Sequence, residues 1–357
     1  MVSANEKIAS GIRRHFIDLT RYDAGLRQKV LRQLNKLEKD LVGKIAASGF
    51  DKEGIEKLST KRYKQFLDEV KGSIASTYSD IKEINTTETQ GLAQIESTFV
   101  TKQVNKTIGV EAAALLNESQ LKQIVKDTFI QGTPLKELWD RQERDITDKF
   151  IDKVRLGMLT GETNEKIIKS IRGTRANSYK DGIFETTRSK ASTLVRTEVA
   201  AVANNARLET YRENSDIIDK LVVFVTFDKR TSDICIARSG LEYTLDGEPI
   251  GHDIAFDGGP PYHPNCRTVL VPVTKEFKDM GIDKEEIPQG TRSTLDGQVP
   301  EDLSFTDWLK TRTIEEQEEI LGVGKAELWR DGKIDLKELV NNDGRPLTLE
   351  KLKKKVD

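Results

Sequence analysis

The chain of 357 residues is poor in cysteine, with only Cys235 and Cys266. Two cysteines cannot build the dense disulfide framework of small secreted proteins, and they indicate synthesis in a reducing compartment. Long apolar runs are also lacking, since no window approaches the roughly 18 residues of a membrane-spanning helix. The first residues show no apolar run followed by a small-residue cleavage site. We therefore expect neither a secretory signal nor a membrane partner.

An excess of one charge is absent as well. The chain has 57 Lys plus Arg and 59 Asp plus Glu, which gives a formal net charge of -2. A dedicated DNA-coating protein is strongly basic, so this near-balance argues against that class. Aromatic residues make up only 6% of the chain and charged residues 32%. Such a polar chain can bury a core, but we expect that core to be thin and mainly helical.

Proline is nearly absent from the first half, where Pro134 is the only one before Pro249. Apolar residues between Ile12 and Ile45 recur mostly at steps of three, four or seven, which is the helical period. A Thr133-Pro134 pair is typical of a helix start, and Thr163 or Asn164 can cap a later helix. The sequence predicts a mainly α protein with long amphipathic N-terminal helices, then a short β-sheet subdomain and a helical tail.

The composition changes near residue 215. Two β-branched runs follow, at 221–227 and 268–273, and they can pair and enclose the irregular segment between them. We expect four regions in chain order. They are an N-terminal helical region at 1–130, a second helical part at 131–215, a small α+β subdomain at 216–275, and a linker with a helical C-terminal tail at 276–357.

A predicted helix over about 187–212 places two polar residues in an apolar stripe. Glu198 and Asn205 share one face with Leu194, Ala201 and Leu208, because these positions step by three and four. In one interpretation this face lies at the edge of the core and both polar residues are solvated. In the other interpretation they are buried and hydrogen-bonded. They would then fix the position of the next element by satisfying its backbone or Arg196.

Both cysteines and two of the three histidines fall within the segment 235–266. Thiolate and imidazole are the ligands that zinc prefers, and four of them match tetrahedral coordination. The candidate ligands of a structural zinc are therefore Cys235, His252, His263 and Cys266. The alternative is a set of packed and hydrogen-bonded residues without metal, since the spacing lacks the C-x2-C pairs of well-defined zinc sites.

An enzymatic alternative is a metal-dependent nuclease or transferase domain centred on residues 228–267. Its hard ligands would come from Asp228, Asp233, Asp246 or Asp257. A Cys–His pair could also activate a thiolate, although nothing in the sequence orients the imidazole. The sequence contains no phosphate-binding loop, dinucleotide fingerprint or nucleophile elbow. Arg230 lies in a turn-like D-K-R-T-S stretch, where a capped turn is a simpler interpretation than a phosphate contact.

Several motifs follow one another in a recognisable order: R-T-E at 196–198, N-N-A-R-L-E-T-Y at 204–211, D-K-R-T-S-D-I-C at 228–235 and P-Y-H-P-N-C-R-T-V-L-V-P-V at 261–273. This order resembles the phage Mu F-like minor head protein family, which includes SPP1-type head proteins. The resemblance covers about 130–357, and H-P-N-C-R is its most specific piece. The residues that carry the family motifs are Arg196, Glu198, Asn205, Asp228, Arg230, Pro264, Asn265 and Arg267.

The chain departs from that family at two positions. Many relatives carry C-P-x-C where this chain has Cys235-Ile236-Ala237-Arg238. They also carry C-R-C where this chain has Cys266-Arg267-Thr268. Two cysteines of a four-thiolate site are thus replaced, and His252 is the candidate substitute ligand.

The resemblance implies a non-enzymatic minor head protein in the virion, made in the host bacterial cytoplasm and located inside the capsid. It implies binding to the portal protein and a role in procapsid assembly, DNA packaging or DNA ejection. Major capsid or scaffolding protein would be a further partner. Basic clusters at 13–14 and 351–355 could contact packaged DNA weakly through its phosphates. We expect no cofactor apart from the candidate structural zinc at Cys235, His252, His263 and Cys266.

Overall fold

The computed structural model describes residues 4–49, 60–276, 278–280, 291–294, 297–300 and 304–356. Much of the expected linker after residue 276 lies outside these ranges, as do the side chains of Arg13 and Arg14. The expected fold class is confirmed, because the chain is mainly α-helical with a small antiparallel sheet. None of the described helices has the length and apolar character required to cross a bilayer.

The chain divides into two compact units, each built from separate segments. Unit 1 comprises 1–19, 92–124 and 200–357, whereas unit 2 comprises 20–91 and 125–199. Three long helices contribute residues to both units: α1 (Ala4–Ser48), α3 (Thr60–Ile108) and α7 (Ile183–Glu213). Local sequence patterns cannot reveal such a division, and its boundaries differ from the four expected regions.

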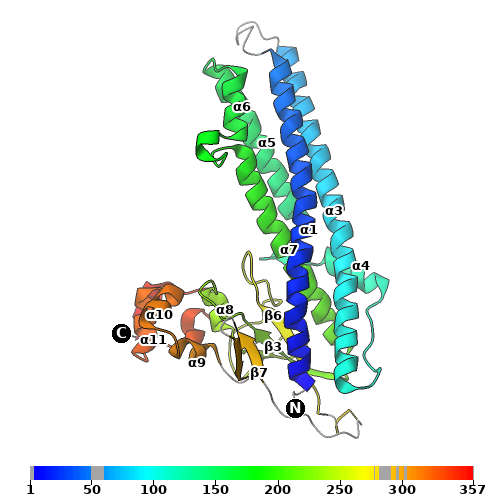
Figure 1. Ribbon diagram of the computed structural model, residues 1–357, viewed down its shortest axis with the longest axis vertical. Coiled ribbons are helices and arrows are strands. Elements are labelled where there is room, and N and C mark those ends of the chain that lie inside the picture. Colours follow the sequence, from blue (N-terminus) through cyan, green and yellow to red (C-terminus); the bar gives the residue numbers. More distant parts are fainter. Residues whose placement is uncertain are drawn as a thin grey trace. The chain divides into compact units, whose positions relative to one another are not determined.

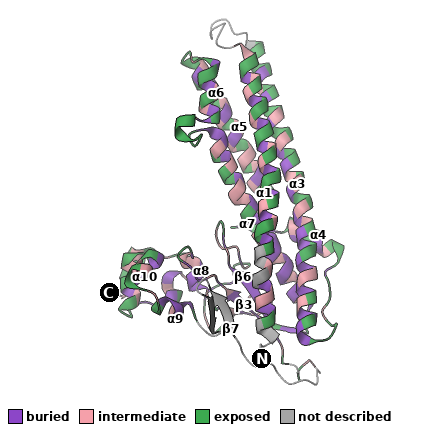
Figure 2. Cartoon of the chain, in the orientation of Figure 1, coloured by how far each residue is buried: buried purple, intermediate pink, exposed green. Residues whose placement is uncertain are grey.

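Unit 2 is formed by parts of α1, α3 and α7 together with α5 (Leu135–Leu159) and α6 (Asn164–Arg172) (Figure 1). The apolar positions predicted for α1 form its buried face, because steps of three and four return to the same side of a helix. Exposed positions alternate with this face along the helix (Figure 2). The residues of the face, none more than 2% exposed, are Leu26, Val30, Leu34, Leu37, Leu41 and Ile45.

The start of α5 differs from the expectation. Thr133 and Pro134 form the short strand β2 (Thr133–Pro134), which pairs with β1 (Phe129–Ile130). Pro134 is therefore the N-cap of α5, and no side chain caps that helix. At α6 the expectation is confirmed, since the Thr163 hydroxyl accepts a hydrogen bond from the backbone N–H of Lys166.

Unit 1 contains a four-stranded antiparallel sheet in the order β5-β4-β3-β6. Its strands are β3 (Ile218–Phe224), β4 (Glu242–Tyr243), β5 (Pro249–Ile250) and β6 (Val269–Thr274). The two predicted strands pair as expected, with Leu221 opposite Pro272. Pro272 and Pro249 lie in the two edge strands of the sheet. Proline is tolerated in an edge strand because one side of that strand has no partner strand to accept a hydrogen bond from its N–H.

The strand β3 begins and ends three residues earlier than the apolar run predicts. Phe227 lies beyond the strand and is buried. Its ring packs against Phe305 and Trp308 of the C-terminal tail, with ring centroids 5.1 and 5.6 Å away. Phe227, at the end of the apolar run, therefore packs against the C-terminal tail and is not part of a strand.

The C-terminal tail belongs to the same buried cluster as the sheet. Trp308, Leu309, Leu339 and Leu352 are among its buried residues. Unit 1 also contains α4 (Glu118–Lys126), α8 (Asp233–Ala237) and the hairpin of β7 (Thr291–Thr294) and β8 (Gly297–Pro300). The tail elements are α9 (Phe305–Lys310), α10 (Ile314–Leu321), α11 (Val323–Arg330), the 3₁₀ helix η2 (Leu336–Leu339) and α12 (Leu349–Val356).

Candidate functional site

The H-P-N-C motif forms a tight turn immediately before β6. The backbone N–H of Cys266 donates to the carbonyl of His263 at 3.1 Å, which closes the turn. Asn265 has a φ of 59°, a left-handed conformation that asparagine tolerates better than most residues. Pro264 fits the preceding turn position because its ring fixes φ near the value that position needs. Pro264 and Asn265 therefore act structurally, by bringing His263 and Cys266 close together.

Cys235 comes from the other side of the irregular segment, on the short helix α8. Ser232 caps this helix, since its hydroxyl accepts a hydrogen bond from the backbone N–H of Cys235. The Cys235 side chain is buried, at 3% exposure, and Cys266 is at 5%. Both thiols are free, so no disulfide joins them.

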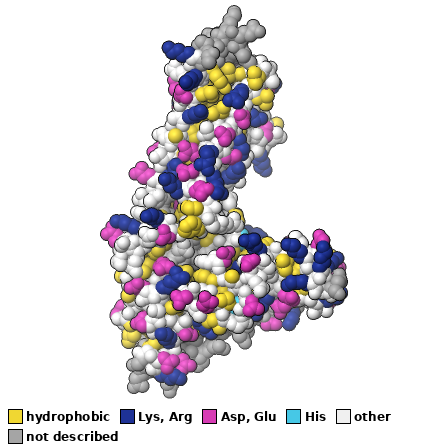
Figure 3. Space-filling view, turned by 180° about the vertical axis from the view of Figure 1, so that it is seen from behind, with side chains coloured by type: hydrophobic (Ala, Val, Ile, Leu, Met, Phe, Trp, Pro, Cys, Tyr) yellow, Lys and Arg dark blue, Asp and Glu magenta, His cyan; other side chains and the backbone are white. Residues whose placement is uncertain are grey.

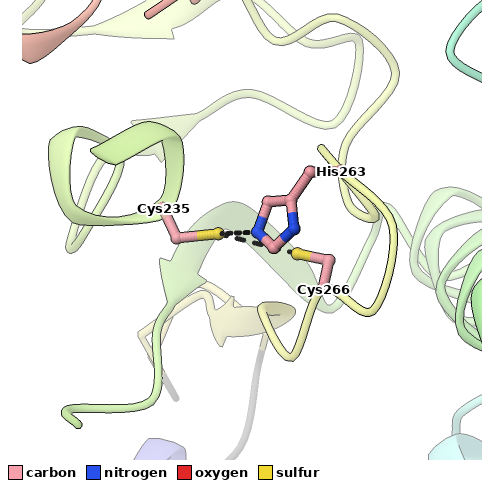
Figure 4. A group of neighbouring side chains, drawn as sticks. All are labelled: Cys235, His263 and Cys266. Carbon is pink, nitrogen blue, oxygen red and sulfur yellow. Dashed lines mark hydrogen bonds between the residues drawn. The ribbon is translucent and has the colours of Figure 1, made fainter. Parts of the chain in front are cut away.

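The three side chains converge at one point (Figure 4). Cys235 Sγ lies 3.1 Å from His263 Nε2 and 3.6 Å from Cys266 Sγ. The Thr268 hydroxyl donates a further hydrogen bond to Cys235 Sγ at 3.1 Å. All three candidate ligand atoms lie within 4.8 Å of one another. The group can bind a soft metal ion or share protons.

Close contact between the two thiols shifts their proton affinities in opposite directions. The hydrogen bond from Cys235, together with His263, lowers the pKa of the Cys266 thiol. The same contact and burial raise the pKa of the Cys235 thiol. The adjacent Cys266 also raises the pKa of His263. One of the two sulfurs can therefore carry negative charge beside a partly positive imidazole.

His252, the fourth expected ligand, is not part of this group. Its Nε2 lies 2.9 Å from the carbonyl oxygen of Glu242, and its Nδ1 accepts from the backbone N–H of Ile254 at 3.2 Å. Both ring nitrogens thus have backbone partners, and the ring packs edge-on against Tyr243. The expected four-residue ligand set is corrected to Cys235, His263 and Cys266.

Asp228 and Arg267 form a pair beside the cluster. The Arg267 guanidinium donates to both carboxylate oxygens of Asp228, and the backbone N–H of Arg230 donates to one of them. Burial alone would raise the pKa of Asp228, but these donors lower it. The Arg230 side chain is 83% exposed and lies 3.8 Å from Asp228. Arg230 thus contributes its backbone to this turn, and Asp228 is engaged by Arg267.

A second acidic residue of the enzymatic hypothesis also has a partner. Asp233 Oδ2 accepts from Lys325 of α11 at 2.6 Å, which connects α8 to the tail. Asp246 and Asp257 are exposed. The structure therefore does not gather these four carboxylates into one group of metal ligands among the described residues.

Arg238 and Thr268, where the resemblance implies cysteines, have separate roles here. Thr268 remains at the cluster as a hydrogen-bond donor to Cys235. Arg238 is 1% exposed, and its Nη1 donates to the carbonyl of Gly344 at 3.0 Å. Its guanidinium also lies over the ring of Tyr262. Arg238 thereby connects α8 to the C-terminal tail.

The R-T-E motif on α7 contributes to unit 2. Arg196 lies 3.6 Å from Asp23 of α1. Glu198 is 2% exposed and accepts from the indole N–H of Trp139 at 3.2 Å, which confirms the buried alternative for this residue. Burial raises the pKa of Glu198 from 4.5 to about 8. Asn205, which belongs to unit 1, is half-buried.

One buried polar group was not expected from the sequence. Glu96 of α3 is fully buried and accepts from Arg207 of α7 at 2.6 Å. His15 of α1 lies 2.6 Å from the other carboxylate oxygen and stacks on Phe99. Burial would raise the pKa of Glu96, but Arg207 and the hydrogen bond with His15 lower it. No local pattern could have revealed this group, because its members lie far apart in the sequence.

A shallow pocket adjoins the Cys–His group. It has an empty volume of about 230 Å³, partly open to solvent. Its lining residues include Cys235, His263, Thr268, Arg230 and Asn265. The group is thus reachable from solvent through the pocket, although both sulfurs are buried.

Comparison with known proteins assigns part of the chain. Residues 148–271 match the family described as Phage Mu protein F like protein. The match begins in α5 and ends in β6, so it contains Glu198, Cys235, His263 and Cys266. No curated protein and no solved structure matches the chain. Residues 148–271 are therefore similar to the phage Mu protein F-like family, and this family suggests a phage head morphogenesis protein.

Proposed function

We propose that the protein is a non-enzymatic minor head protein that binds the portal inside the capsid. In this position it assists procapsid assembly, DNA packaging or DNA ejection. The observation that carries the proposal is the match of residues 148–271 to the phage Mu F-like family. The balanced charge of -2 supports it, since the protein can remain beside packaged DNA without coating it.

Unit 2 supplies the surface that fits a protein partner best. Leu156 and Leu159, in the last turn of α5, are 56% and 68% exposed. They are three positions apart, so they lie on neighbouring parts of one helix face. Hydrophobic side chains gather near one end of this unit (Figure 3). Both leucines fall within the matched segment, and we propose that they contact the portal.

The location in the virion is tested by quantitative mass spectrometry of purified particles of the phage that encodes the chain. DNA-filled particles should contain the protein at a few copies per portal ring. Emptied particles, analysed alongside, separate the roles: loss on emptying favours ejection, and retention favours assembly or packaging. Absence from both kinds of particle would contradict the proposal of a virion component.

The portal contact is tested by co-expression of the full chain with the portal protein of the same phage. Leu159→Asp should lower the recovered complex about tenfold, because a charge would lie in the centre of an apolar contact. The matched control is Ile314→Asp, which changes a residue of similar exposure, 57%, in unit 1. Equal recovery of the two variants would exclude the α5 surface, and no recovery of wild-type complex would exclude portal binding.

A further inference from the structure

We propose that Cys235, His263 and Cys266 bind one zinc ion through two thiolates and one imidazole, with a fourth position that opens into the adjacent pocket. The head role does not depend on this proposal, and the proposal does not depend on the head role. It rests on geometry, on hydrogen bonds around the three side chains, and on where the pocket lies.

The distances between the three side chains are close to those of a tetrahedral site. Zinc binds sulfur at about 2.3 Å and imidazole nitrogen at about 2.0–2.1 Å, so two bound sulfurs lie about 3.8 Å apart and sulfur and nitrogen about 3.6 Å apart. The observed separations are 3.6 Å between the sulfurs and 3.1 Å between Cys235 Sγ and His263 Nε2. Side-chain rotations that move these atoms by a few tenths of an ångström would therefore admit the ion.

Hydrogen bonds around the group prepare the ligands for a metal. His263 Nδ1 lies 2.9 Å from the carbonyl oxygen of Pro264 and can donate its proton there. That tautomer leaves a lone pair on Nε2, the atom nearest to the sulfurs. Metal-binding histidines have this arrangement as a rule, since a carbonyl or carboxylate holds the other ring nitrogen. The Thr268 hydroxyl donates to Cys235 Sγ in the same supporting role.

The charge balance of the site favours a divalent ion. Binding of Zn²⁺ displaces one proton from each thiol, so the ion and two thiolates sum to zero and two protons enter solvent. The neighbouring Arg267 is already neutralised by Asp228. Without a metal, two buried thiols and an imidazole must share protons among themselves. The ion would also connect α8 to the turn before β6 and so close the irregular segment between them.

The fourth position has no protein ligand among the described residues. His252 is held by backbone groups elsewhere, and no described carboxylate joins the three ligand atoms. The pocket of about 230 Å³ borders both Cys235 and His263. Three protein ligands plus an open position leave room for an exchangeable water. The geometry therefore points to an open site and not to a closed four-residue one.

The first test measures the metal content of the full chain. Protein from zinc-supplemented cells, purified with a thiol reductant and without chelator, should contain about one zinc per chain by mass spectrometry. Cys266→Ser and His263→Gln should each lose most of it. His252→Gln is the matched control, because it removes the other histidine of this segment and should retain the zinc. Zinc-free wild-type protein, or retention of zinc by both ligand variants, would overturn the proposal.

The second test uses cobalt and does not depend on how the variants fold. Wild-type protein loaded with Co²⁺ should show tetrahedral ligand-field bands and a thiolate charge-transfer band. Added azide should change these bands if water occupies the fourth position. An unchanged spectrum would overturn the open position, and the absence of a thiolate band would overturn the site.

Discussion

Glu198 offers a quantitative test of how burial changes the pKa of an ionisable group in unit 2. Its carboxyl is 2% exposed, and its hydrogen-bond donor is the indole N–H of Trp139. Burial raises the pKa of Glu198 to about 8, because one neutral donor offsets little of the lost solvation. At neutral pH the folded protein therefore holds this carboxyl protonated, whereas the unfolded chain ionises it.

The size of the effect follows from the two pKa values. Between about 4.5 and about 8, at 1.36 kcal/mol per pKa unit, proton uptake on folding costs about 3 kcal/mol at pH 7. Because the folded pKa lies above the unfolded one, the contribution of Glu198 to stability is complete below about pH 4.5. It then falls by about 1.4 kcal/mol per pH unit as the pH rises toward 8.

The informative substitution is Glu198→Gln. Glutamine keeps an acceptor for Trp139 and cannot ionise, so the variant should lose this pH dependence. Its extra N–H lacks an assigned partner, which costs about 1 kcal/mol. We expect the variant to be slightly less stable than wild type at pH 5, and more stable by about 3 kcal/mol at pH 8.

The assay is urea unfolding at pH 5, 6, 7 and 8, followed by tryptophan fluorescence and circular dichroism. Trp139 lies beside the substitution, so its share of the fluorescence reports on unit 2, whereas Trp308 and Trp329 report on unit 1. The control is Glu213→Gln, which changes an exposed carboxyl of the same helix and should follow wild type at every pH. Parallel stability curves for wild type and Glu198→Gln from pH 5 to 8 would refute the reasoning.

Three further predictions concern stability. Glu96→Gln should cost about 3–5 kcal/mol in urea unfolding, because Arg207 would remain buried without its counter-charge; a loss below about 1 kcal/mol would contradict this. Gly344→Ala should release the tail and speed its proteolysis, since a Cβ there would meet Arg238 Nη2 at 1.5 Å and the glycine has a φ of +74°; unchanged proteolysis would count against that contact. Phe150→Ala should destabilise unit 2 by about 3–5 kcal/mol because Phe150 is fully buried, and unaltered unfolding would contradict its place in the core.

Features that depend on neighbouring residues could be predicted from the sequence. The buried face of α1 follows from a spacing of three and four, and the cap at Thr163 follows from its own hydroxyl. The pairing of β3 with β6 was also predicted, because both are β-branched runs separated by a segment too irregular to form a core. In each case the pattern and the structure share one local cause.

Features that depend on distant residues could not be predicted. The Glu96–Arg207–His15 group joins three helices, and nothing near Glu96 in sequence indicates a guanidinium beside it. The place of His252 depends on the path of the segment after β4, which turns both ring nitrogens to backbone groups. The sequence offers four candidate ligands, but only the path of the folded chain shows that three of them lie together.

Arg238 and Thr268 show why replaced motif positions need a structure. Both stand where the resemblance implies a cysteine, and from the sequence alone both count as replaced ligands. Thr268 contacts Cys235, and its hydroxyl donates a hydrogen bond to the Cys235 sulfur where a further thiolate would otherwise stand. The Arg238 side chain instead extends to Gly344 and Tyr262. One replacement thus preserves the surroundings of the cluster, and the other turns a ligand position into a link with the tail. The three-ligand open site that we propose follows from these two different outcomes.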